Sequence, residues 1–142
     1  MDGVTKGTIG GTFCGIAVAF ASAIETIKFI KKNDLCARAL EIGKKVEAFY
    51  KGLAEKYPVV GDVRGIGAMM GTEFVKDLKT KEPYPELVTK LVQTTARKGL
   101  IIESAGTYNN VVRFLCPLVV TDEQLEAGFK IMEESLKECL ES

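Results

Sequence analysis

The chain has 142 residues, of which 46% are hydrophobic and 27% are charged, with 19 basic and 19 acidic side chains. This length and balance are typical of an ordinary soluble protein that buries a real core. Because the charges cancel and form no block of one sign, nothing electrostatic favours nucleic acid or a membrane as a partner.

The first segment, residues 1–33, combines a glycine-rich loop with a very apolar helix. The stretch CGIAVAFASAIETIKFIKKN predicts a helix that is apolar on nearly all sides in its first half, and such a helix needs protein cover all round. With the residues before it, the stretch also has features of a signal peptide, which are a lysine, an apolar centre and a small-residue end. Asp2 in the leader and an apolar pattern that continues past Ala23 favour a buried helix over a signal peptide or a membrane span. We therefore expect residues 1–33 to belong with a larger body.

Residues 34–142 are predicted to form a small α+β domain, a three-stranded sheet covered by helices. The expected order is a helix ending before Pro58, one strand over GDVRGIGAMMGTEFV, a helix from Pro85 to Gly99, two short strands in LIIES and VVRFLC, and a last helix. Thr121 and Gln124 form a capping box that starts this last helix. The first of these helices is predicted from one apolar stripe, Leu35, Ala39, Ile42, Val46, Phe49 and Leu53.

Glycines 65, 67 and 71 invite a nucleotide-binding interpretation. Their spacing is GxGxxxG, however, and a strand and a charged turn follow where a phosphate-binding helix should begin. The pattern therefore favours close packing of the backbone over ligand binding.

The chain has no histidine, and its four cysteines, Cys14, Cys36, Cys116 and Cys139, are widely scattered. The spacing of these cysteines matches no metal-binding motif, so we predict no metal site. The cysteines are instead expected to be small buried apolar side chains in a reducing cytoplasm. Without histidine there is no Ser/His or Cys/His nucleophile pair. We expect no catalytic residue in this chain, so that a cofactor or another segment would carry any chemistry.

Arg113 stands alone in the apolar run NNVVRFLCPLVV, with no aspartate or glutamate between Ser104 and Val120. A buried guanidinium without a partner is costly. One interpretation is that a strand holds this planar group rigidly so that it binds a carboxylate through two hydrogen bonds. The other is a structural arginine that reaches water or pairs with a distant carboxylate such as Glu73 or Glu103.

Five segments in order, GGTFCG, DVRGIGAMMGTEF, KGLII, GTYNNVVRFLCPLVVTDEQ and FKIMEESLKE, resemble the C-terminal part of class III pyridoxal-phosphate aminotransferases. The resemblance covers essentially the whole chain and is greatest to 4-aminobutyrate aminotransferases. It implies the small C-terminal domain of a fold-type I transferase, preceded by a segment of the large domain. It also implies that the Schiff-base lysine lies upstream of this chain, so that the chain alone should be inactive and should not hold pyridoxal phosphate.

The resemblance assigns roles to three residues. Gly11 and Thr12 of GGTFCG match the segment that binds the cofactor phosphate, and Arg113 matches the arginine that binds a substrate carboxylate. Without the resemblance, Thr12 would be interpreted as a helix N-cap, and the two roles need not exclude each other, because amides at a helix start also suit a phosphate. The motif departs from the family in having Ile16 and Ala17 where Asn-Pro is common.

The partners implied by the resemblance are an ω-amino acid such as 4-aminobutyrate, 2-oxoglutarate, the chain's own N-terminal large domain, and further copies in a homodimer or higher homo-oligomer in the cytoplasm. Tyr108 and Asn110 beside the arginine strand either line the same pocket or pack the loop. The alternatives are a free-standing module that binds a small carboxylate, and an oligomerisation module. The apolar first helix and the GGT segment favour the transaminase over the free-standing module. Pairing of the helix at residues 16–30 with its copy in another chain would instead favour the oligomerisation module.

Overall fold

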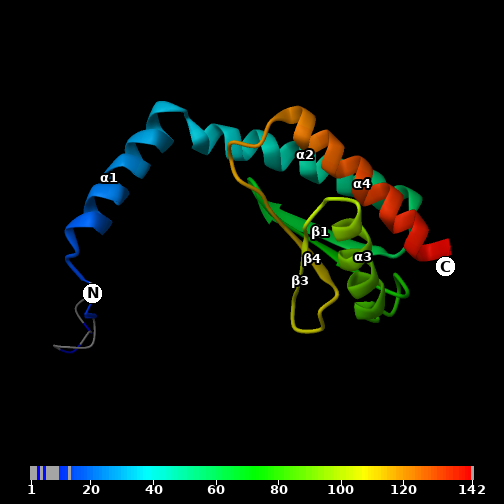
Figure 1. The fold of residues 1–142 in the computed structure, drawn as a ribbon. Helices are drawn as coiled ribbons and strands as arrows, with labels where there is room; N and C mark the ends of the chain where they lie inside the picture. Colours follow the sequence, from blue (N-terminus) through cyan, green and yellow to red (C-terminus); the bar gives the residue numbers. More distant parts are fainter. Residues whose placement is uncertain (1–2, 4, 6–9, 13, 142) are drawn as a thin grey trace. The chain divides into compact units, whose positions relative to one another are not determined.

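The structure is a computed structural model that describes residues 3, 5, 10–12 and 14–141. The chain divides into two compact units, residues 1–35 and 36–142. Figure 1 labels the helices and most of the strands.

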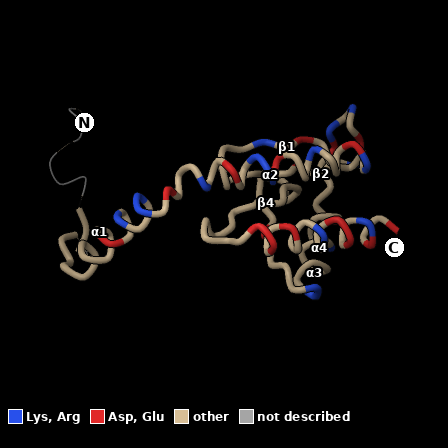
Figure 2. The backbone as a smooth tube through the Cα atoms, turned by 90° about the horizontal axis from the view of Figure 1, so that it is seen from above, with Lys and Arg blue, Asp and Glu red and all other residues tan. Residues whose placement is uncertain are grey.

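The first unit contains the expected apolar helix, α1 (Ala17–Lys32). Its first two turns carry no charge, and charged residues begin at Glu25 (Figure 2). None of its residues is buried. Its large exposed apolar side chains are Val18, Phe20, Ile24, Ile27 and Phe29. The helix ends at Lys32, and the side-chain amide of the following Asn33 donates a hydrogen bond of 2.8 Å to the carbonyl oxygen of Phe29. Within the described residues, no helix is both long enough and apolar enough to cross a membrane.

The second unit is an α+β arrangement that begins with helix α2 (Leu35–Lys56). The elements that follow are β1 (Val60–Ile66), β2 (Met69–Phe74), α3 (Pro85–Arg97), β3 (Glu103–Ala105), β4 (Val111–Leu115) and α4 (Asp122–Glu141). The strands form a four-stranded sheet in the order β1-β2-β4-β3, and every neighbouring pair is antiparallel.

The predicted α+β class is confirmed, but the sheet has four strands where three were expected. The stretch predicted as one strand is a hairpin, because the chain turns at Gly67, whose φ of +55° lies in the left-handed region that favours glycine. Gly65 shows the close packing that the glycine pattern predicted. A Cβ built on Gly65 would lie 2.2 Å from the carbonyl oxygen of Met69.

The helices cover one face of the sheet, as the alternation of buried and more exposed residues along β2 shows. Met70, Thr72 and Phe74 are buried, whereas the residues between them are exposed or half-buried. The core between sheet and helices includes side chains from every helix of this unit, such as Ile42 and Leu53 of α2, Leu91 of α3 and Leu136 of α4. The opposite face of the sheet, which is called the open face below, carries the residues at Met69, Gly71 and Glu73 of β2.

The helix boundaries follow the local sequence signals closely. The capping box at the start of α4 is confirmed, since the backbone N–H of Gln124 donates to Thr121 Oγ1 at 3.2 Å and that of Thr121 donates to Gln124 Oε1 at 3.1 Å. Pro85 occupies the first turn of α3, as expected. The cysteine prediction is confirmed for Cys139, which is buried, and is wrong for Cys14 and Cys36, which are exposed.

An ionic cluster joins the start of α2 to the segment that leads from β4 into α4. Arg38 Nη2 donates to the Val120 carbonyl oxygen and to Asp122 Oδ1, both at 2.8 Å. Lys45 Nζ lies 2.5 Å from the other carboxylate oxygen of Asp122. The connection that follows the arginine strand is therefore tied to α2 at two points.

Candidate functional site

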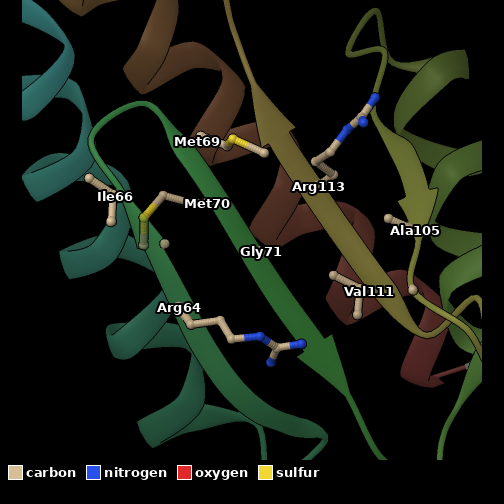
Figure 3. A pocket seen from close by; sticks show the side chains of 10 residues that line it. Arg64, Ile66, Met69, Met70, Gly71, Ala105, Val111 and Arg113 are labelled. Atoms are coloured by element: carbon tan, nitrogen blue, oxygen red, sulfur yellow. The ribbon is translucent and has the colours of Figure 1, made fainter. Parts of the chain in front are cut away.

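A row of four residues crosses the open face of the sheet. In the strand register, Arg64 of β1 lies opposite Gly71 of β2, Gly71 lies opposite Arg113 of β4, and Arg113 lies opposite Glu103 of β3. Two arginines therefore flank a glycine that has no side chain. Figure 3 shows both guanidinium groups on this face, with Gly71 between their strands.

Arg113 stands between two shallow depressions. The first, of about 410 Å³, lies over Gly71 and is lined by Arg64, Met69, Val111 and Arg113 among others (Figure 3). The second, of about 470 Å³, lies on the β3 side of Arg113 and is lined mainly by apolar residues such as Ile101 and Leu115. The guanidinium of Arg113 is thus accessible from both sides, and its side chain is 44% exposed.

Arg113 forms an ion pair with Glu103, through its Nη2 and a carboxylate oxygen of the glutamate. Glu103 is one of the two partners that the structural interpretation of this arginine named. The other, Glu73, lies 2.9 Å from Arg64 Nη1 instead. The pair with Glu103 is an exposed one, and exposed pairs contribute little to stability. It therefore leaves Arg113 free to exchange one carboxylate for another.

Arg64 is more firmly paired than Arg113. Its Nη1 lies 2.5 Å from Asp62 and 2.9 Å from Glu73. The hydrogen bonds to Asp62 and then to Glu73 raise the pKa of the Arg64 guanidinium above its ordinary value. The sequence did not single out Arg64, although Asp62, Arg64 and Ile66 alternate along β1 and so share one face.

Asn110 has a packing role. Its side chain is buried, and its amide donates to the Phe74 carbonyl oxygen at 3.0 Å and to Glu73 at 3.2 Å. It therefore ties the start of β4 to the end of β2, next to the arginine row. Tyr108 is 65% exposed in the loop before β4.

Gly11 and Thr12 lie in the first unit, in a turn where the Gly11 carbonyl oxygen accepts a 3.0 Å hydrogen bond from the backbone N–H of Cys14. Both residues are exposed. Helix α1 begins at Ala17 with Ile16 as its N-cap. The alternative that Thr12 caps this helix is therefore wrong.

The exposed hydroxyl of Thr12 and the exposed turn backbone are groups of the kind that bind a phosphate, so the described part of this segment fits the phosphate of a cofactor. Positions 6–9 and 13 lie outside the described residues. Among the described residues, no group of three or more histidine, cysteine or acidic side chains could hold a metal ion.

Residues 1–136 match the aminotransferase class-III family. The chain belongs to this family. The resemblance of its five segments to class III aminotransferases is thereby confirmed.

Among the curated relatives, 5-aminovalerate aminotransferase DavT of Pseudomonas aeruginosa is 39% identical over 97% of this chain and 32% of its own length. The 4-aminobutyrate aminotransferase GabT of Escherichia coli is 37% identical over 98% of this chain and 33% of its own length. An alanine/serine racemase of Pyrococcus horikoshii is 35% identical over 96% of this chain and 28% of its own length. The chain therefore spans about a third of the length of the curated relatives it matches.

Solved structures of aminotransferases share the fold. A Bacillus anthracis aminotransferase is 28% identical and superposes with a TM-score of 0.76 over 82% of this chain and 27% of its own. An amine transaminase from an uncultivated Pseudomonas species, solved in its pyridoxal-phosphate-bound form, reaches a TM-score of 0.84 over 94% of this chain and 30% of its own, at 24% identity. The predicted fold, that of a small domain of a pyridoxal-phosphate transferase, agrees with these structures.

Proposed function

We propose that the chain is the C-terminal part of a pyridoxal-phosphate-dependent aminotransferase that transfers the amino group of 4-aminobutyrate, or a similar ω-amino acid, to 2-oxoglutarate. The observation that carries this proposal is the match of residues 1–136 to class-III aminotransferases. The names of the two relatives at 37% and 39% identity support an ω-amino acid as the donor.

In this proposal Arg113 binds the carboxylate of the substrate. A planar guanidinium meets a carboxylate with two parallel hydrogen bonds, and the backbone of β4 fixes the direction from which Arg113 reaches the ligand. Its position between two depressions, with 44% of its side chain exposed, supports this role because a ligand can reach it.

Gly11 and Thr12 would hold the cofactor phosphate in the same proposal, with the threonine hydroxyl and exposed backbone N–H groups as donors. When bound, pyridoxal phosphate supplies the electron sink that amino transfer requires. The protein's own contribution is to orient the substrate relative to the cofactor, which is the role given to Arg113.

The proposal is tested in the full-length protein with the variant Arg113→Ala. Loss of a bidentate pair should lower kcat/KM by roughly two to three powers of ten for the amino donor and for 2-oxoglutarate. Cofactor content and the melting temperature should stay near those of the unaltered protein. A kcat/KM within about threefold for both substrates, or an unfolded variant, would make the arginine structural.

The choice of donor needs its own comparison, because the relative at 35% identity is a racemase of alanine and serine. We therefore compare 4-aminobutyrate, 5-aminovalerate and alanine as donors in the same assay. The proposal expects the two ω-amino acids to be used in preference to alanine.

The 142-residue chain alone is expected to be inactive and to hold no cofactor, because no lysine in it matches the Schiff-base position of the family. Incubation with pyridoxal phosphate followed by borohydride reduction should give no stoichiometric adduct at one lysine. Such an adduct, accompanied by turnover of 4-aminobutyrate, would contradict this expectation. The full-length protein is expected in the cytoplasm as a homodimer or higher homo-oligomer.

A further inference from the structure

Gly71 does not show the close backbone packing that Gly65 shows. A Cβ built on Gly71 would lie 3.4 Å from Val111 Cγ1 and 3.9 Å from the Arg64 carbonyl oxygen, which are ordinary van der Waals distances. The φ of Gly71 is not positive, and the register of β2 with both neighbouring strands is regular at this position. The fold therefore has room for a side chain at position 71.

A glycine inside a strand carries a cost. It weakens the strand relative to alanine, because it loses more backbone freedom on folding and has no side chain to pack against its neighbours. Where neither a positive φ nor a close backbone contact requires it, glycine in a strand often marks a place that a ligand approaches. Gly71 fulfils both conditions, and it lies in the middle of the arginine row.

The space that a side chain at position 71 would take is the depression of about 410 Å³ on the open face. Arg64 lines one side of this depression and Arg113 another (Figure 3). Arg64 does not fill the space, because two carboxylates hold its guanidinium and no atom of its side chain lies within 4 Å of the Cβ position. The strand at Gly71 is thus uncovered next to Arg113.

The lining of the depression indicates which kind of ligand fits it. Arg113 supplies a positive charge that pairs with a carboxylate. The lining side chains besides the two arginines are apolar, and Ile66 and Met69 among them are exposed. A guanidinium beside an apolar surface suits a ligand that carries a carboxylate next to a hydrocarbon chain. Short aliphatic carboxylates, including ω-amino acids, have this structure.

We propose that Gly71 is a specificity-determining residue, whose missing side chain leaves room beside Arg113 for the hydrocarbon chain of a small carboxylate. This inference rests on the proposed role of Arg113 and deepens it. A methyl group at position 71 would take this room from the chain, and it would lie more than 4 Å from every atom of Arg113. The affinity that is lost therefore grows with the length of the chain, and a ligand with almost no chain loses little.

The test measures the binding of two simple acids, butyrate and acetate, to the full-length protein by calorimetry. Both acids carry a carboxylate and have no amino group to transfer, but butyrate has two more methylene groups. Gly71→Ala should bind butyrate roughly four- to fifteenfold more weakly, because each displaced methylene group corresponds to about a fourfold change in Kd. Its Kd for acetate should stay within about twofold of the unaltered value.

Gly52→Ala is the matched control, because it makes the same substitution in α2 at a place where a Cβ meets nothing within 4 Å. It should leave the Kd of both acids unchanged. The melting temperature of Gly71→Ala should equal or exceed that of the unaltered protein, since a methyl group fits the strand there. A lower melting temperature with equal losses for the two acids would overturn the inference, because the glycine would then serve the packing of another segment.

Arg113→Ala separates this inference from the function on which it rests, and it should weaken the binding of acetate and butyrate alike. If it does so while Gly71→Ala leaves butyrate binding unchanged, the space over Gly71 receives no ligand and the proposed role of Arg113 stands. If Arg113→Ala changes neither Kd, the role of Arg113 is wrong and the inference falls with it. Weaker binding of butyrate alone by Gly71→Ala, together with weaker binding of both acids by Arg113→Ala, supports both.

Discussion

Gly43 of α2 is in backbone contact with Gly67 at the turn between β1 and β2. A Cβ built on Gly43 would lie 2.2 Å from the carbonyl oxygen of Gly67 and 2.6 Å from its carbonyl carbon. A side chain at position 43 would overlap these backbone atoms, so the helix and the turn can approach this closely only because residue 43 is glycine. This close approach places the β1–β2 hairpin, which carries Arg64 and Gly71 of the arginine row, directly on the helix.

We expect Gly43→Ala to destabilise the chain by about 1–3 kcal/mol, because the added methyl group meets backbone atoms and the hairpin or the helix has to shift. This cost should exceed the gain of about 1 kcal/mol that alanine brings to a helix interior. The free energy of unfolding is measured by urea titration of the 142-residue chain.

Gly52→Ala is the control in the same helix. A Cβ built on Gly52 meets nothing within 4 Å, so alanine should stabilise the chain by about 0.5–1 kcal/mol. Opposite signs for the two variants are expected. A stabilising Gly43→Ala would show that the hairpin is not seated on α2 in this way.

The elements that the sequence predicted well are those defined by neighbours along the chain. The start of α4 follows from Thr121 and Gln124, and three of the residues in the predicted apolar stripe of α2, Ile42, Val46 and Leu53, are buried. Capping and helical periodicity act over a few residues, so one segment contains all the information they need.

The hairpin was missed because its turn is not polar. Gly67 and Ala68 interrupt an apolar run without the Asn-Gly or Asp-Gly pair that usually signals a hairpin. Arg113 could be singled out as a charge in an apolar strand, and Glu103 as one possible partner. The row with Arg64 could not be predicted, because it depends on the register of three strand pairs.

Thr121→Ala should destabilise the chain by about 1 kcal/mol, because the backbone N–H of Gln124 would lose the hydroxyl that accepts its hydrogen bond. Thr121→Ser keeps the hydroxyl and should stay within a few tenths of a kcal/mol of the unaltered chain. Thermal and urea unfolding of both variants provide the comparison. Equal losses in the two variants would show that the methyl group, and not the cap, matters at this position.

Asp122→Asn should make stability less dependent on pH. Hydrogen bonds from Lys45 and then from Arg38 hold the pKa of Asp122 below its ordinary value. A carboxylate whose pKa is lowered by folding adds stability above its unfolded pKa of about 3.9, and this stability is lost as the pH falls through the folded value. The variant should melt at a lower temperature than the unaltered chain at pH 7, and the difference should shrink below about pH 4.

The control for this titration is Glu126→Gln in the same helix. Glu126 is exposed, and the described residues give it no ion pair. Its substitution should change the melting temperature little at pH 7. A difference for Asp122→Asn that stays constant from pH 7 to pH 3 would mean that the charge of Asp122 does not stabilise the fold.

Helix α1 should either make the 142-residue chain self-associate or be poorly ordered in it. Phe20 is 59% exposed and Phe29 is 51% exposed on a helix with no buried residue, and apolar surface of this kind drives association. Sedimentation at increasing concentration should show a rising average mass. The double variant Phe20→Ser with Phe29→Ser should reduce this rise, and a clean monomer with α1 fully protected in hydrogen exchange would contradict the prediction.

Arg113→Lys in the full-length protein separates the charge of this residue from its shape. Lysine keeps the positive charge and can still pair with Glu103, but its ammonium group cannot make the two parallel hydrogen bonds of a guanidinium. We expect kcat/KM for 4-aminobutyrate and for 2-oxoglutarate to stay within roughly tenfold of the value for Arg113→Ala. Cofactor content and melting temperature, measured on the same samples, should match those of the unaltered protein. If lysine instead restored kcat/KM to within about threefold of the unaltered protein, a positive charge at the end of a flexible side chain would suffice, and the bidentate geometry proposed for Arg113 would be wrong.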